Sequence, residues 1–196
     1  MANKEGIILS IHDIIYDSAV SYFNLDLPII PLCSYNHRGY SDKHKATCKS
    51  PGKRPVLKAW TSHKHTTEEH LDEWFGINKY INIGMVLGQT EHWNIVGVDI
   101  DGELGETMFQ EISKDKEVPH TWEFTSGNGR RLLYLLPDGL ATQKNKVAWK
   151  EGHEELAFLA QGQQTVMPPS MHPSGKQYTW IDGHSPFECD IAMAPN

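Results

Sequence analysis

Two aspartates, one residue apart, are the residues whose type and spacing first suggest chemistry. Asp99 and Asp101 end the apolar run IVGVDID, residues 95–101. Side chains in a strand alternate between faces, so both carboxylates should point to one side while Ile100 points into the packing. Two like charges on one face repel each other and resist desolvation. A divalent cation would compensate them, because hard cations bind carboxylate oxygens; the alternative is a solvated turn with Gly102.

A second set of possible ligands lies in and beside the polar stretch 35–65, which has no hydrophobic periodicity and predicts a long loop. Cys33, His37, His44 and Cys48 form a C-x₃-H pair followed by an H-x₃-C pair. Structural zinc takes four nitrogen and sulfur ligands, so these pairs predict a zinc site. The alternative is that Cys33 continues an apolar strand and is simply buried.

The same loop contains a candidate phosphate-binding segment, SPGKRP, residues 50–55. Its backbone amides and Lys53 have the chemistry to meet a phosphate group. A cluster of surface charges is the alternative explanation.

Composition limits the class of protein. A chain of 196 residues with 39% hydrophobic and 22% charged residues predicts one domain, 1–196, with a real core. The net charge of -7 argues against coating nucleic acid through bulk electrostatics, but not against a nucleic-acid enzyme. Three widely spaced cysteines favour a reducing, cytoplasmic compartment over a disulfide scaffold. No apolar run is long enough for a membrane helix, and MANKEGIILSIHD lacks the features of a signal peptide.

The elements that must position these residues follow from periodicity. A helix is expected over 12–24, a strand over 27–34, and a helix capped by Thr66 with Glu69 in a capping box. The runs 80–88 and 93–101 should be neighbouring strands joined by the turn QTEH. A helix over 103–114, a hairpin over 121–137, and the strand segments LAFLA, QTVMPPS and YTW complete the pattern. Interspersed strands and helices predict α+β or α/β packing around a mixed sheet.

Six segments in one order resemble a known family. They are PIIPL, GKRPVLKAW, NIGMVLG, VGVDIDG, PHTWEFTSGNGRRLLY and QQTVMPPSMHPSGKQYTW. Together they resemble the bifunctional DNA primase/polymerase N-terminal domain, a branch of the archaeo-eukaryotic primase superfamily, over about residues 14–182. The resemblance implies an α+β fold, with an RNA-recognition-motif-like mixed or antiparallel sheet, flanking helices and an N-terminal α/β portion. It also implies template-directed nucleotidyl transfer with Mg²⁺ or Mn²⁺.

The resemblance implies roles for particular residues. Asp99 and Asp101 match the family's first motif, which binds the catalytic metal. The second motif is a glycine-rich turn followed by a histidine that contacts the nucleotide phosphates. Here Ser126 and Gly129 belong to the turn, and Arg131 stands where the histidine would be. Arginine can pair bidentately with a phosphate but cannot titrate near neutral pH; the alternative is a solvated hairpin arm.

The third family motif is a carboxylate on a later strand. Its usual register falls on Ala157, but Glu155, two residues earlier, would share that strand face. Either Glu155 completes the metal site or the third carboxylate is missing, which would weaken metal binding. The segment PPSMHPSG places Ser170 and His172 beside the expected cleft, where both are candidate nucleotide contacts.

Three functions therefore compete. The first is a primase/polymerase domain acting on template DNA and nucleoside triphosphates in the replication of a mobile element, phage or plasmid, with a helicase fused to its C-terminus or supplied in trans. The second is a catalytically degenerate relative that binds nucleotide or template without chemistry. The third is a haloacid-dehalogenase-type phosphatase, because VDIDGELG resembles that class's nucleophile loop; against it, Glu103 replaces a threonine and no doubly wound run follows.

Overall fold

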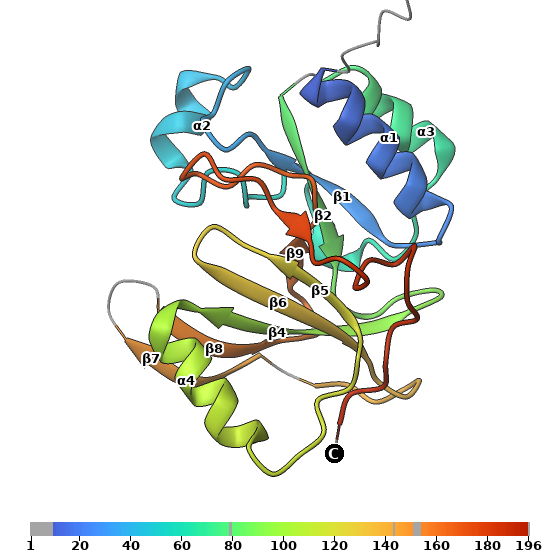
Figure 1. Ribbon diagram of the computed structural model, residues 1–196. Coiled ribbons are helices and arrows are strands. Elements are labelled where there is room, and N and C mark those ends of the chain that lie inside the picture. The colour runs from blue at the N-terminus through green and yellow to red at the C-terminus, as the bar shows by residue number, and fades with distance from the viewer. Residues whose placement is uncertain (1–9, 79, 143, 151–153, 196) are drawn as a thin grey trace, which may run out of the picture.

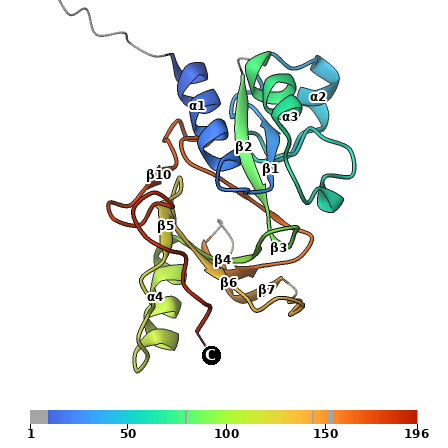
Figure 2. The same cartoon turned by 90° about the vertical axis from the view of Figure 1, so that its right-hand side faces the viewer.

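The computed structural model describes residues 10–78, 80–142, 144–150 and 154–195. Its strands form two antiparallel sheets that lie one above the other (Figures 1 and 2). The three-stranded sheet has the order β1-β2-β9, with bounds Ile29–Cys33, Ile81–Val86 and Gln164–Val166. The seven-stranded sheet has the order β10-β5-β6-β4-β8-β7, with β3 pairing β4; the bounds are β3 Gly88–Gln89, β4 Asn94–Asp101, β5 Trp122–Thr125, β6 Gly129–Leu135, β7 Asn145–Lys150, β8 Glu154–Leu159 and β10 Thr179–Trp180. The predicted α+β class is confirmed.

The N-terminal unit consists of the three-stranded sheet and its helices (Figure 1). Helix α1, Ile11–Phe23, begins at a capping box between Ser10 and Asp13 and buries Ile15, Ala19 and Tyr22. Strand β1 is buried along its whole length, which explains its unbroken apolar sequence. The predictions of a helix over 12–24 and a strand over 27–34 are confirmed to within two residues at each end.

The next helix begins one residue later than predicted. Helix α3, Glu68–Leu71, is capped by Thr67, and its capping box uses His70 rather than Glu69. Thr66 is buried instead, and its hydroxyl donates to the Ile29 carbonyl at 3.0 Å. The helix continues as a π turn, η2, Asp72–Gly76. Two adjacent threonines can each act as a cap, and the tertiary contact of the first leaves the second to cap the helix.

The prediction that 80–88 and 93–101 form neighbouring strands is wrong. Strand β2 pairs with β1 and β9, whereas β4 lies at the centre of the other sheet. The chain changes sheets at Gly88, whose φ of +90° is rarely accessible to other residues. Only the short β3, which begins at that glycine, pairs with β4. Both apolar runs are buried, and local sequence does not say in which sheet each one is buried.

The seven-stranded sheet has two differently covered faces. One face of β4 carries Val96, Val98 and Ile100, which belong to a core cluster that packs against helix α4, Gly102–Ser113. The opposite face carries Ile95, which joins the main core shared with the N-terminal unit. Asp99 and Asp101 alternate with Ile100 and therefore lie on the face toward the N-terminal unit. This placement puts the acids at the junction of the two units.

The long segment 35–65 is more ordered than its composition predicts. It contains the short helix α2, Asp42–Thr47, and one 3₁₀ turn, η1, Trp60–Ser62. Its end returns to β1, where Leu32 bridges Pro55. Strand β7 was not predicted from the sequence.

Among the described residues, no helix has both the length and the apolar character needed to cross a membrane.

Candidate functional site

Strand β4 positions the two aspartates between two partner strands. Asp99 lies opposite Arg131 of β6 and opposite Ala157 of β8. Asp101, two residues on, lies opposite Gly129 of β6 and opposite Glu155 of β8. The expected same-side arrangement of the aspartates follows from this register.

Three carboxylates meet at this end of the sheet. Asp99, Asp101 and Glu155 each offer an oxygen, and these oxygens all lie within 4.8 Å of one another. Asp99 is buried, and the other two are partly buried. In this register Glu155 lies beside Asp101, whereas Ala157, at the position of the family carboxylate, lies beside Asp99. A set of three oxygen donors is the chemistry that Mg²⁺ and Mn²⁺ accept.

The electrostatics of Asp101 reflect this crowding. Burial raises the pKa of its carboxyl, and the charge of Asp99 raises it further. Arg131, Lys53 and a hydrogen bond from Ser126 act in the opposite direction. The net raised pKa means that the carboxylate form is disfavoured, so an added cation would stabilise it.

Arg131 is the residue that neutralises Asp99. Its Nε donates to the Asp99 Oδ1 at 3.0 Å, and its Nη2 makes a closer contact with the same oxygen. Its Nη1 donates to the Thr165 hydroxyl at 2.7 Å. Arg131 is 9% exposed, so the structure holds it as the partner of an acid rather than as a free phosphate-binding group.

Arg130 lies on the opposite face, as alternation along β6 requires. It pairs with Glu106 of α4 at 3.0 Å and with Glu123 of β5 at 2.6 Å, and its guanidinium lies over the Phe109 ring. The two adjacent arginines therefore have separate roles. Neither arginine lies on a solvated hairpin arm, which was the alternative that the sequence left open.

The hairpin turn between β5 and β6 borders the acids closely. The Ser126 hydroxyl donates to the Asp101 Oδ1 at 3.2 Å. A Cβ built on Gly129 would lie 1.9 Å from the Ile100 carbonyl oxygen, so this position requires glycine. A Cβ on Gly127 would lie 2.2 Å from the Nδ1 of His172, so the histidine ring rests on the turn.

Lys53 and His172 complete the rim of the site. The Lys53 charge opposes the net rise in the pKa of the Asp101 carboxyl and contributes to the lowered pKa of His172. Burial is the larger cause for His172. The segment 50–55 (the lysine loop), the turn 126–128 (the glycine turn) and the segment 168–175 (the proline-serine loop) thus converge beside the three carboxylates.

Ser170 occupies a different place from the one its motif implied. It is fully buried, and its hydroxyl accepts from the Ile83 amide at 2.9 Å and donates to the Ile83 carbonyl at 3.3 Å. These contacts hold the proline-serine loop against β2. Ser170 is therefore placed to position the loop that carries His172.

Two residues that sequence reasoning missed also support the site. Asn82 donates to the carbonyls of Gly52 and Met171 at 2.9 and 2.8 Å, joining the lysine loop to the proline-serine loop. A polar residue inside the apolar run YINIGMV was the signal. Tyr178 is buried near Arg131, and burial raises the pKa of its phenol; the sequence offered no signal for it.

The predicted zinc ligands also lie together, away from these acids in the sequence. Cys33, His37, His44 and Cys48 each offer a donor atom within 4.8 Å of the others.

The comparisons with known proteins agree with this arrangement. The family model of the bifunctional DNA primase/polymerase N-terminal domain matches residues 19–196. A search of curated proteins found no match. The matched range includes both sheets and all the candidate residues, and the antiparallel α+β architecture is consistent with such a domain. The resemblance found in six sequence segments is confirmed, and the chain belongs to the bifunctional DNA primase/polymerase N-terminal domain family.

Proposed function

We propose that this domain performs metal-dependent, template-directed nucleotidyl transfer. The observation that carries the proposal is the approach of Asp99, Asp101 and Glu155 to within 4.8 Å on the face where three loops converge. Phosphoryl transfer depends mainly on positioning and charge neutralisation, which a set of carboxylates beside a lysine can organise. Mg²⁺ or Mn²⁺ held by these acids would neutralise the incoming triphosphate and activate the primer hydroxyl.

The side chains around the acids have definable tasks in this proposal. Ser126 orients Asp101 through its hydrogen bond, and Gly129 lets the hairpin approach the strand. Lys53 supplies a positive charge for triphosphate oxygens. His172 lies on the same rim, where its imidazole can donate to a phosphate or base.

One observation favours the second candidate function, binding without chemistry. Arg131 already neutralises Asp99 in a buried pair, so a divalent cation would have to compete with a fixed guanidinium charge. In that case the domain would hold nucleotide or template but form no product. The phosphatase alternative has lost its support, because every ladder between the described strands is antiparallel, whereas that class uses a doubly wound parallel sheet.

A primer-extension assay separates the two candidates. The chain is incubated with labelled dNTP or NTP, Mg²⁺ or Mn²⁺, and primed or unprimed templates. Asp99→Ala should abolish the product, while Glu111→Gln, an exposed change on α4, should leave it intact. Metal-dependent binding of dNTP without any product would instead support the second candidate.

A gain-of-function pair strengthens the assay. If Arg131 and Ala157 make the site degenerate, the double change Arg131→His and Ala157→Glu should create extension where the unchanged chain has none. If the unchanged chain already extends primers, the two substitutions are not needed for extension.

The proposal extends to the setting of the domain. We infer that residues 1–196 act as one domain, and that replication of a mobile element, phage or plasmid is its context. A helicase joined to the C-terminus or supplied in trans would provide the single-stranded template DNA that such a domain copies.

A further inference from the structure

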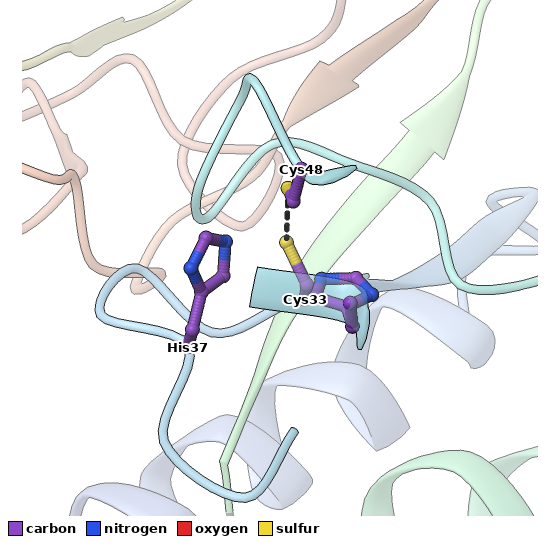
Figure 3. A group of neighbouring side chains, drawn as sticks. Cys33, His37 and Cys48 are labelled. Carbon is purple, nitrogen blue, oxygen red and sulfur yellow. Dashed lines mark hydrogen bonds between the residues drawn. The ribbon is translucent and has the colours of Figure 1, made fainter. Parts of the chain in front are cut away.

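Four possible metal ligands gather where strand β1 leaves the three-stranded sheet. Cys33 is the last residue of β1, and His37 lies in the turn that follows. His44 lies in α2, and Cys48 is the C-cap residue of that helix. Figure 3 shows the two cysteine side chains pointing toward each other, with the His37 ring beside them. The end of β1 and the short helix α2 thus bring the C-x₃-H pair and the H-x₃-C pair together.

The separation of the two sulfurs fits a shared metal ion. The Cys33 Sγ and the Cys48 Sγ are 3.9 Å apart. A disulfide requires a separation of about 2.05 Å. Two thiolates at about 2.3 Å from a tetrahedral zinc ion lie about 3.8 Å apart, from the tetrahedral angle alone.

The histidines lack the hydrogen-bond partners that buried polar atoms need. The Nε2 atoms of His37 and His44 are both buried and have no hydrogen-bond partner among the described residues. Buried nitrogen without a partner costs free energy, so such atoms call for a ligand. His37 also adopts a φ of +58°, a left-handed conformation that residues other than glycine rarely take. Coordination of a metal ion would account for both features.

We propose that Cys33, His37, His44 and Cys48 bind a structural Zn²⁺ ion. The set of two sulfur and two nitrogen donors is one that zinc accepts in tetrahedral geometry. Four protein ligands leave no open position for a substrate, so the ion is structural rather than catalytic. This site is separate from the carboxylates, whose oxygen donors suit a harder cation.

The zinc site would fix the loop that carries Lys53. The segment returns to β1 immediately beside the ligands: the Gly52 amide donates to the Ser34 carbonyl at 3.1 Å, and the Cys33 amide donates to the Arg54 carbonyl at 2.9 Å. Few apolar side chains lie between His37 and Lys53, so packing alone gives the loop little stability. This consequence for Lys53 rests on the proposed function, whereas the metal site does not.

Metal content of the full chain tests the site directly. The protein is expressed with zinc, dialysed, and analysed by elemental mass spectrometry under reducing conditions. We expect about one zinc per chain, and after replacement by Co²⁺ the absorption bands of a tetrahedral thiolate complex. Cys48→Ser and His44→Ala should lose most of the metal. Cys189→Ser, at the cysteine outside the cluster, should keep it.

Three results would overturn the site. The first is a purified chain that contains no zinc and shows no thiolate absorption bands with Co²⁺. The second is equal metal loss in Cys189→Ser and Cys48→Ser. The third is a Cys33–Cys48 disulfide in the chain as purified. A folding defect in Cys48→Ser is recognised from its far-ultraviolet circular dichroism, and the unchanged chain's stoichiometry and cobalt spectrum still decide the question.

Limited proteolysis tests the effect on the loop. Chelation of zinc should speed cleavage within residues 35–55 several-fold, while the rest of the chain remains resistant. Cleavage that does not respond to a chelator would contradict the structural role. Asp99→Ala should retain zinc while losing extension, so failure of the proposed catalytic function and failure of the zinc site give different results.

Discussion

Arg131 and Asp99 form a buried ion pair at the centre of the carboxylate site. A buried charge that loses its partner is strongly destabilising, because its desolvation is no longer compensated. In this structure the guanidinium of Arg131 supplies that compensation to Asp99. A divalent cation beside Asp99 would supply it in another way.

We therefore expect Arg131→Met to lower the free energy of unfolding by about 3 kcal/mol without metal. Mn²⁺ should restore part of the loss, because a cation at the three carboxylates compensates Asp99. Urea denaturation with and without Mn²⁺ measures both effects. Arg130→Met is the matched control, since Arg130 pairs with Glu106 and Glu123 on the opposite face. An equal response of the two variants to Mn²⁺ would contradict this account.

The glycines of the hairpin turn provide a second test at the residue scale. A Cβ at Gly129 meets backbone, the Ile100 carbonyl oxygen at 1.9 Å, which cannot move without displacing β4. The three atoms nearest to a Cβ at Gly127 all belong to the His172 side chain, which can shift at less cost than backbone. We expect Gly129→Ala to cost about 3 kcal/mol and Gly127→Ala about 1 kcal/mol, by the usual cost of overpacking. Thermal unfolding of both variants checks the order, and a larger loss at Gly127 would contradict it.

Helix α4 is held to the sheet by packing and by the Glu106–Arg130 ion pair. The hydrogen bond from Arg130 is the main cause of the lowered pKa of Glu106. A carboxyl with a lowered folded-state pKa stabilises the fold above its ordinary pKa. That contribution is lost as the pH falls through the folded-state value.

We expect Glu106→Gln to lower the free energy of unfolding near pH 7 by about 0.5 kcal/mol, because the pair is partly exposed and Arg130 keeps Glu123. The difference from the unchanged chain should disappear in acid, below the lowered pKa of Glu106. Denaturation at a series of pH values measures it. Glu111→Gln, on an exposed position of the same helix, should show no such pH dependence.

Elements with strong local signals could be predicted from sequence. The helix over 103–114 and the hairpin over 121–137 were recognisable from periodicity and the glycine turn, and the structure confirms both. The assignment of β2 and β4 to different sheets could not be predicted, because each is an apolar run whose partners lie far away in sequence. The cap at Thr67 was missed because Thr66 is used in a tertiary hydrogen bond.

The candidate site was predictable to the extent that it depends on strand alternation. Alternation alone placed Asp99 and Asp101 on one face and identified Glu155 as the acid sharing the strand face of Ala157. The partner of Arg131 could not be predicted, since it depends on the register between β4 and β6. Whether these residues bind metal stays a prediction.

At the scale of the molecule, the site lies where the two sheets share one core. Ile83 of β2 and Leu133 of β6 belong to the same buried cluster, although they come from different sheets. Tyr22 of α1 adds polar links, because its hydroxyl donates to the Pro168 carbonyl at 2.7 Å and accepts from the Trp180 Nε1 at 2.8 Å. Lys53 from the N-terminal unit therefore faces acids on the other sheet only while this core is intact.

Because the two sheets share one core, we expect them to unfold as one cooperative unit. We expect one calorimetric transition, with the van't Hoff enthalpy equal to the calorimetric enthalpy. Tyr22→Phe should move the whole transition to lower temperature without splitting it, because the lost hydroxyl leaves a buried carbonyl and an indole N–H without this partner, at a cost of about 1–3 kcal/mol. Tyr16→Phe is the control, because the Tyr16 hydroxyl donates to Asp72 at an exposed position. This change should shift the transition less. Two separate transitions, with only one sensitive to Tyr22, would show that the sheets fold independently and that the site forms by docking of two units.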